Sequence, residues 1–310
     1  MSFIAEIIVA LPENWESARR SINGVLGATN KAAVHVTVLR GQKRDKQLTV
    51  YLRKLEQKGS LSVVDYGASL GLAAAINGVV HAHPTGDVIF LDCGAIVSDG
   101  WIDVIGTCKA RFERIATISC PSNSAGIAGY PRPWTPNPHL PASELVRLPS
   151  FFSKANGETV LEFNKPHTTC VFLPRESIRI VGGFSESIRQ EWPTILAEWA
   201  ERASQQGLKH FLCAGLFVRA DVVGGCDDAI SDINSPPAIQ QEDPARPVRR
   251  LVDWERLCRS RKPRVLLITH RQGGGVERHV AGLSSTLEGH AEPIVLRPAG
   301  DDAVSIQWSR

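Results

Sequence analysis

Asp92 is the residue of this sequence with the clearest potential for chemistry. It directly follows the apolar run 88–91 (Val-Ile-Phe-Leu), which is typical of a buried parallel strand. Ligands of open α/β sheets bind at the carboxyl ends of the strands. A carboxylate there can hold Mg²⁺ or Mn²⁺ against the phosphates of a substrate. The second position after Asp92 is Gly94, so this strand end supplies a single acid.

The segments around Asp92 alternate between strand and helix patterns. Apolar runs predict strands at residues 7–11, 34–39, 61–64, 88–91, 115–120, 167–173 and 211–218. Helical spacing predicts helices at residues 13–26, 45–58, 70–82, 101–113 and 192–206. The regular alternation in the first half indicates a parallel sheet with helical crossovers. We expect the proline-rich segment 130–149 to form an irregular loop over the sheet edge.

Length, charge and cysteine usage limit the class of protein. The 310 residues can bury a full core, and 35 Lys+Arg against 32 Asp+Glu give a net charge of +3, too small to indicate a nucleic acid partner. The seven cysteines form no Cys-x-x-Cys pair, which favours reduced thiols and a cytoplasmic location. We expect no transmembrane segment, so a place at the inner face of a membrane would depend on partners.

Composition divides the chain into three parts. Residues 1–226 carry the alternation of strands and helices, and residues 227–263 are rich in proline and charge, which predicts a linker with one short helix. Residues 264–310 begin a new pattern of strand, glycine loop, helix and strand, in which the loop contains Gly273, Gly274 and Gly275. Glycines let a loop approach a ligand and a helix amino terminus attracts anions, so this loop is a candidate phosphate site.

Two motifs within 1–226 point to a known family. The strand ending in Asp92 resembles the strand of family-2 glycosyltransferases that ends in an Asp-x-Asp pair, and residues 69–78 resemble that family's Asn-x-Gly-x-x-x-Ala-x-Asn-x-Gly helix start. The resemblance implies an α/β fold of the GT-A nucleotide-sugar transferase type, with a mixed, mostly parallel sheet flanked by helices. It also implies a divalent metal, Mn²⁺ or Mg²⁺, and as partners a nucleotide-sugar and a glycan acceptor.

The same resemblance assigns roles to individual residues. It implies that a nucleotide-sugar contacts Pro12, Asn14, Arg40, Ser69, Gly71, Asn77 and Asp92, and that Asp92 is the metal ligand. For Asn14, a local role as helix N-cap is the alternative. An inverting transferase needs a carboxylate beside the acceptor hydroxyl as its catalytic base. Glu191 and Glu198 are the candidates, and for Glu198 an ordinary ion pair on a helix face is the alternative.

Four positions depart from the family's pattern. Gly94 replaces the second acid of the pair, and Leu39 and Arg40 replace acids that contact the nucleobase. The last strand has no histidine ligand and offers only Asp221, while apolar residues stand at 195–196 in place of the catalytic Glu-Asp pair. These departures predict weak or lost nucleotide-sugar transfer, with a scaffolding or glycan-binding role in polysaccharide or cell-surface glycan biosynthesis.

Two alternatives remain open. The first is an active inverting glycosyltransferase that uses Asp92 and Glu191 to transfer a sugar from a nucleotide-sugar to a glycan. The second is a protein-interaction module that docks a partner through the 130–149 loop, where an exposed apolar patch would surround Trp134.

The pattern in 264–310 resembles the opening of family-4 glycosyltransferases, which have the GT-B fold and begin with a strand, a Gly-Gly-x-Glu loop and a helix. These residues are too few for a complete Rossmann domain. The resemblance therefore implies a partial Rossmann-like β-α-β unit, followed in a longer protein by the rest of a downstream glycosyltransferase module.

Overall fold

The computed structural model describes residues 5–29, 34–42, 45–67, 70–124, 126–131, 137, 142–188, 191–221, 264–269, 275–287, 290–298 and 304–308. The chain divides into two compact units, Met1–Ser235 and Pro236–Arg310. The division falls within the predicted linker 227–263, whose own residues lie outside the described part of the chain. Each unit is considered by itself below.

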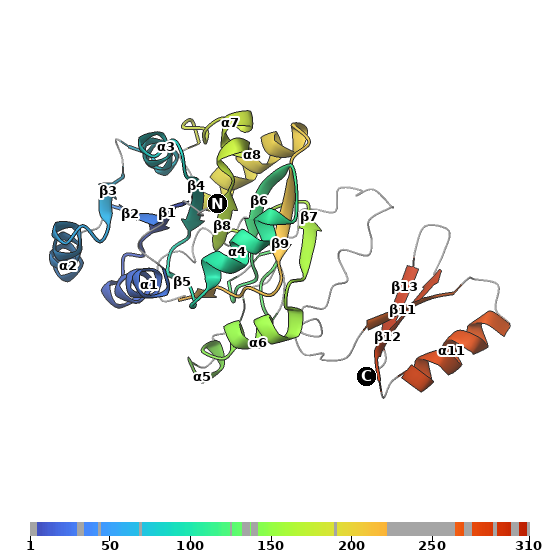
Figure 1. Cartoon of the computed structure of the whole chain (residues 1–310). Helices are drawn as coiled ribbons and strands as arrows, with labels where there is room; N and C mark the ends of the chain where they lie inside the picture. Colours follow the sequence, from blue (N-terminus) through green and yellow to red (C-terminus); the bar gives the residue numbers. More distant parts are fainter. Residues whose placement is uncertain are drawn as a thin grey trace. The chain divides into compact units, whose positions relative to one another are not determined.

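An eight-stranded sheet with the order β3-β2-β1-β4-β8-β6-β9-β7 forms the centre of the first unit (Figure 1). Its strands are β1 (Ala5–Ala10), β2 (Val34–Arg40), β3 (Ser62–Asp65), β4 (Asp87–Leu91), β6 (Ile115–Ser119), β7 (Val160–Phe163), β8 (Cys170–Leu173) and β9 (Lys209–Cys213). Strands β1 to β4 pair in parallel, and β6 pairs in parallel with β9. Strand β8 runs antiparallel between β4 and β6, and β7 runs antiparallel to β9. The predicted mixed, mostly parallel sheet is confirmed.

A second, two-stranded sheet lies beside the end of β4. It consists of β5 (Ala95–Ile96) and β10 (Arg219–Ala220), paired antiparallel. Asn123 fixes β10 in place, because its amide nitrogen donates to the Ala220 carbonyl and its amide oxygen accepts from the Ala220 N–H, both at 2.7 Å. This small sheet brings the last described residues of the first unit next to the residues that follow Asp92.

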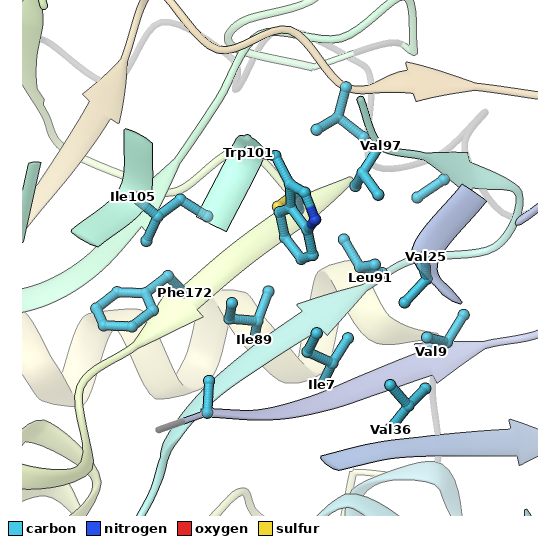
Figure 2. Close-up of a cluster of buried hydrophobic side chains, with 14 of the residues drawn as sticks. Ile7, Val9, Val25, Val36, Ile89, Leu91, Val97, Trp101, Ile105 and Phe172 are labelled. Carbon is cyan, nitrogen blue, oxygen red and sulfur yellow. The ribbon is translucent and has the colours of Figure 1, made fainter. Parts of the chain in front are cut away.

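Helices cover both faces of the large sheet. They are α1 (Trp15–Ala28), α2 (Lys46–Gln57), α3 (Leu72–Ala82), α4 (Trp101–Ala110), α5 (Ala142–Leu145), α6 (Leu148–Asn156), α7 (Arg175–Val181) and α8 (Trp192–Gln205). Successive residues of a strand point to opposite faces. Accordingly Ile7 and Ile89 pack with α1, α2 and α4 on one face, and Ile8 and Phe90 pack with α3, α7 and α8 on the other. Trp101 of α4, with no exposed surface, fills the first of these cores above β4 and β8 (Figure 2).

The structure corrects one sequence expectation and adds elements that the patterns did not reveal. Helix α5 and the start of α6 lie within the predicted irregular loop 130–149. Pro149 is in the first turn of α6, where proline costs no hydrogen bond, so proline there marks a helix start and not a loop. The described residues also include α7, β5, β7 and β13, for which no prediction was made.

The second unit is a three-stranded sheet with one helix. Strand β11 (Arg264–Ile268) is followed by α11 (Gly275–Leu287), β12 (Glu292–Pro298) and β13 (Val304–Trp308). Strands β11 and β12 are parallel, and β13 is antiparallel to β12. The predicted β-α-β unit is thereby confirmed. In neither unit is any helix of the described residues long and apolar enough to cross a bilayer.

Candidate functional site

The carboxyl ends of four parallel strands meet at one edge of the large sheet. Strand β1 has β2 on one side and β4 on the other, so the chain reverses its direction of winding between β1 and β4. Such a reversal opens the crevice in which α/β proteins bind ligands. Pro12 and Asp92 follow the two strands that border it, and Arg40 and Asp65 end the next two strands. The edge therefore carries the predicted site residues of β1, β2 and β4.

Asp92 is held firmly by backbone hydrogen bonds. Its N–H donates to the Thr169 carbonyl at 2.9 Å, and its Oδ1 accepts from the Cys93 N–H at 2.8 Å. The side chain is only partly accessible. Burial raises the pKa of Asp92 to about 7; the Cys93 N–H opposes this shift, and the negative charge of Glu191 adds to it. The folded protein therefore binds the Asp92 proton more tightly than an ordinary aspartate does.

The backbone leaves no room for a second acid two residues further on. Gly94 has φ of +72°, and a Cβ atom at this position would lie 2.8 Å from the carbonyl oxygen of Asp221. The Asp221 N–H in turn donates to the Gly94 carbonyl at 2.9 Å. The Asp221 carboxylate does not supply the missing second acid, because it forms an ion pair with Arg20 on α1. Arg20 Nη2 and Asp221 Oδ2 are 2.6 Å apart.

The donor set at this edge does not fit the divalent metal that the family resemblance implies. The strand end supplies one carboxylate, because Gly94 leaves no space for a second and the Asp221 carboxylate pairs with Arg20. Within the described ranges, the groups of three or more metal-ligating side chains do not include Asp92. We derive no step of a reaction through a metal here.

The two predicted catalytic acids differ in their surroundings. Glu191 is exposed at the N-cap position of α8 and acts electrostatically on Asp92, so the fold brings these two acids to one site. Glu198 lies two turns further along α8 and forms an ion pair with Arg202, with Nε and Oε1 2.6 Å apart. That geometry is the ordinary ion pair considered as the alternative for Glu198.

Arg40 is engaged by a neighbouring acid. Its Nε and Nη2 donate to the two carboxylate oxygens of Asp65 at 2.7 and 3.0 Å, and Nη1 donates to the Thr49 hydroxyl at 3.3 Å. The forked pair links the ends of β2 and β3. A nucleotide would therefore meet a guanidinium whose donors are already directed to protein oxygens.

The remaining predicted contacts are placed as follows. Asn14 caps α1, since its Oδ1 accepts from the Ser17 N–H at 3.1 Å, and Gly71 precedes α3 with open space where a Cβ would be. Asn77 is buried, and its amide bonds the backbone of Phe184 in both directions at 2.8 Å. These bonds occupy Asn77, so its predicted nucleotide contact gains no support. Ser69 lies outside the described residues, as does Trp134.

The glycine loop of the second unit is described only at its end. Gly275 is the first residue of α11, while Gly273 and Gly274 belong to the segment that the structure does not describe. The predicted phosphate loop therefore stays a prediction.

A buried polar network below Asp92 escaped the sequence analysis. The Ser122 hydroxyl lies 2.7 Å from His167 Nε2 and 3.0 Å from the Thr169 hydroxyl, and all three side chains are buried. Burial lowers the pKa of His167 to about 4, so this imidazole is neutral at physiological pH. The Thr169 carbonyl accepts the Asp92 N–H, which links the network to the strand end. The spacing of these residues in the sequence did not predict the network, because they come from two separate segments.

Comparisons with known proteins agree with this architecture. No protein-family model and no curated protein matches the sequence. The crystal structure of GalNAc-T7 with UDP, GalNAc and Mn²⁺ is similar over 70% of this chain and 44% of its own, with a TM-score of 0.52 and 15% identity. The structure of S. aureus TarS 1–349 with UDP-GlcNAc is similar over 74% of this chain and 61% of its own, with a TM-score of 0.50 and 10% identity.

At such low identity these similarities concern the fold, and they show that the first unit has the GT-A fold implied by its motifs. The chain spans less than half of GalNAc-T7 and less than two thirds of the TarS fragment.

Proposed function

We propose that the first unit is a family-2-like glycosyltransferase domain in which metal-dependent transfer from a nucleotide-sugar is weak or absent. The observation that carries this proposal is the single acid at the strand end. Asp92 has a raised pKa, and the backbone contact between Gly94 and Asp221 excludes a second carboxylate. A strand end with one acid gives a divalent ion held against a diphosphate half the protein charge that an Asp-x-Asp pair would supply.

In this proposal the domain acts as a scaffold or glycan-binding module of a cytoplasmic protein that builds polysaccharide or cell-surface glycan. The second unit supplies the opening strands of a family-4 glycosyltransferase module, and the first unit binds an acceptor glycan or positions that downstream module. The β-α-β order of β11, α11 and β12 supports this assignment.

A second candidate function is supported by one specific observation, the electrostatic contact of Glu191 with Asp92. In a metal-independent inverting transferase, Glu191 would accept the proton of an acceptor hydroxyl. The hydroxyl oxygen would form a bond to the anomeric carbon, and the bond from that carbon to the nucleoside diphosphate would break.

Calorimetry and turnover measurements with the full chain distinguish the proposed function from the second candidate function. The chain is titrated with UDP-, GDP- and dTDP-sugars, with and without Mn²⁺, and release of nucleoside diphosphate is measured with a glycan acceptor present. The proposed function predicts no Mn²⁺-dependent turnover. Turnover without metal that is lost in Glu191→Gln but kept in Glu198→Gln would establish the second candidate. Mn²⁺-dependent turnover that is lost in Asp92→Asn would contradict the proposed function.

A further inference from the structure

Three metal-ligating side chains converge at the amino ends of β1 and β2, the edge of the sheet opposite to Asp92. They are Glu6 on β1, His35 on β2 and His83 just after α3. One ligand atom of each lies within 4.8 Å of the other two. Glu6 is near the amino end of β1, whereas Asp92 follows the carboxyl end of β4. This cluster is therefore distinct from the candidate site at the other edge.

Distances around the Glu6 carboxylate suit a tetrahedral ion. His35 Nδ1 lies 2.9 Å from Oε2 of Glu6, and His83 Nδ1 lies 3.6 Å from the same oxygen. Ligands bound at about 2.0–2.1 Å around a tetrahedral Zn²⁺ are about 3.3–3.4 Å apart. The two imidazole rings stack with 4.4 Å between their centroids and 27° between their planes. An ion would replace the present hydrogen bond between His35 and Glu6, and each ring would turn its Nδ1 toward the ion. The two histidine side chains are 42% and 38% exposed, which leaves them room to do so.

Neighbouring groups orient the ligands as they do around known metal sites. The Thr37 hydroxyl donates to Oε1 of Glu6 at 2.6 Å, and His35 Nδ1 lies 3.0 Å from the same oxygen and 2.9 Å from Oε2. The Ser62 hydroxyl lies 3.2 Å from His35 Nε2, the ring nitrogen remote from Glu6. A partner on the second nitrogen fixes the orientation and tautomer of a ligating histidine.

The charge and burial of Glu6 also favour a cation. Its side chain is 1% exposed, and a buried carboxylate needs a positive partner. Arg175 acts electrostatically on Glu6, but its guanidinium donates to backbone carbonyls, with Nη1 3.2 Å from Val80 O and Nε 2.7 Å from Gly86 O. Arg175 thereby braces the turn that carries His83.

We propose that Glu6, His35 and His83 form a Zn²⁺ site with water in the fourth position. Two imidazoles and one carboxylate are a ligand set that suits Zn²⁺ and related transition metals better than Mg²⁺ or Ca²⁺. The ion would tie β1, β2 and the turn before β4 together at the edge of the sheet.

The test uses the full chain, freed of metal by chelation and dialysis. Bound zinc is measured by mass spectrometry of the metal, and thermal unfolding is followed with ZnCl₂ or MgCl₂. We expect one zinc per chain and a zinc-dependent rise in Tm that MgCl₂ does not produce. His83→Gln and His35→Gln should each weaken zinc binding about tenfold or more.

Two matched variants locate the ion. His81→Gln changes an exposed histidine of the same helix, and Asp92→Asn changes the acid at the opposite edge, so both should keep the zinc. Zinc bound equally well by His83→Gln and His35→Gln, or none bound by the unchanged chain, would overturn the proposal. A thiolate charge-transfer band after substitution with Co²⁺ would also overturn it, because the ion would then be held by cysteine.

Discussion

At the scale of single residues, the chemistry of Asp92 is set by what surrounds it. The apolar run before it placed it correctly at the end of a buried strand, which the sequence could predict because β4 is a short and continuous hydrophobic segment. Its raised pKa could not be predicted, since it depends first on burial in the folded protein and then on the charge of Glu191, a residue 99 positions further along the chain.

The raised pKa of Asp92 predicts a pH-dependent stability. A carboxyl group that binds its proton more tightly in the folded than in the unfolded protein stabilises the fold at low pH and loses that contribution as pH rises from about 4 to about 7. Asp92→Asn removes this loss. We expect the variant to gain on the order of 1–2 kcal/mol over the unchanged chain at pH 8 compared with pH 5, a reduced figure because the side chain is partly solvated.

Urea unfolding at the two pH values measures the difference. Equal pH dependence in the two proteins would show that Asp92 is ionised and well solvated in the folded state. Glu198→Gln serves as the control, since it alters a half-buried ion pair on α8 and leaves the surroundings of Asp92 unchanged.

The backbone contact at Gly94 predicts a second stability effect. Gly94→Ala places a Cβ at positive φ and 2.8 Å from a carbonyl oxygen, so we expect a loss of about 2 kcal/mol or more in the free energy of unfolding. Gly78→Ala is the matched control: it lies inside α3 with nothing within 4 Å of its Cβ, and it should gain up to about 1 kcal/mol. Chemical denaturation of both variants measures these changes. A Gly94→Ala protein as stable as the unchanged chain would show that β10 can shift to accommodate the new Cβ atom.

At the scale of elements, the turn of residues 182–184 after α7 is held by side chains of two helices. Trp199 Nε1 donates to the Gly182 carbonyl at 2.9 Å, Arg202 donates to the Gly183 carbonyl at 2.8 Å, and Asn77 bonds the Phe184 backbone. Helices α3 and α8 thus hold the same turn from two sides. The sequence resemblance singled out Asn77 as a nucleotide-sugar contact but could not show that it bonds the Phe184 backbone instead.

Removing the hydrogen bonds between Asn77 of α3 and the Phe184 backbone should destabilise the first unit. Asn77→Ala leaves the Phe184 N–H without its buried acceptor, and we expect a loss of about 2–3 kcal/mol in the free energy of unfolding. Glu198→Gln keeps the bonds of Arg202 to the turn and should cost less than about 0.5 kcal/mol. Urea midpoints and slopes of the two variants test the contrast, which fails if both changes cost the same.

Strand order was the part of the fold that local patterns could not supply. Periodicity identified the parallel strands β1 to β4, because each is an apolar run bounded by helices. It did not indicate that β8 enters between β4 and β6 in the opposite direction, since strand direction and neighbours depend on contacts between segments far apart in the sequence.

At the scale of the whole molecule, the second unit exposes apolar side chains of its first strand. Leu266 and Ile268 of β11 are 54% and 69% exposed, although parallel strands normally have both faces covered. In the proposed longer protein, helices of a family-4 module would cover this face.

Because the two units are separately compact, deleting 264–310 should leave the first unit folded with its Tm unchanged within error. Circular dichroism and thermal unfolding of the shortened chain check this. A large fall in Tm would mean that the second unit is an integral part of the first domain, and that its resemblance to family-4 enzymes is accidental.

The contact between Gly94 and Asp221 also has an evolutionary consequence. A change of one codon could restore an acid at position 94, but the new side chain would collide with the carbonyl oxygen of Asp221. A paired-acid strand end would first require a shift of β10, which Asn123 and the β5 pairing hold in place. A single substitution at position 94 is therefore not enough to build such a pair, and at least one further change in β5 or β10 would have to accompany it.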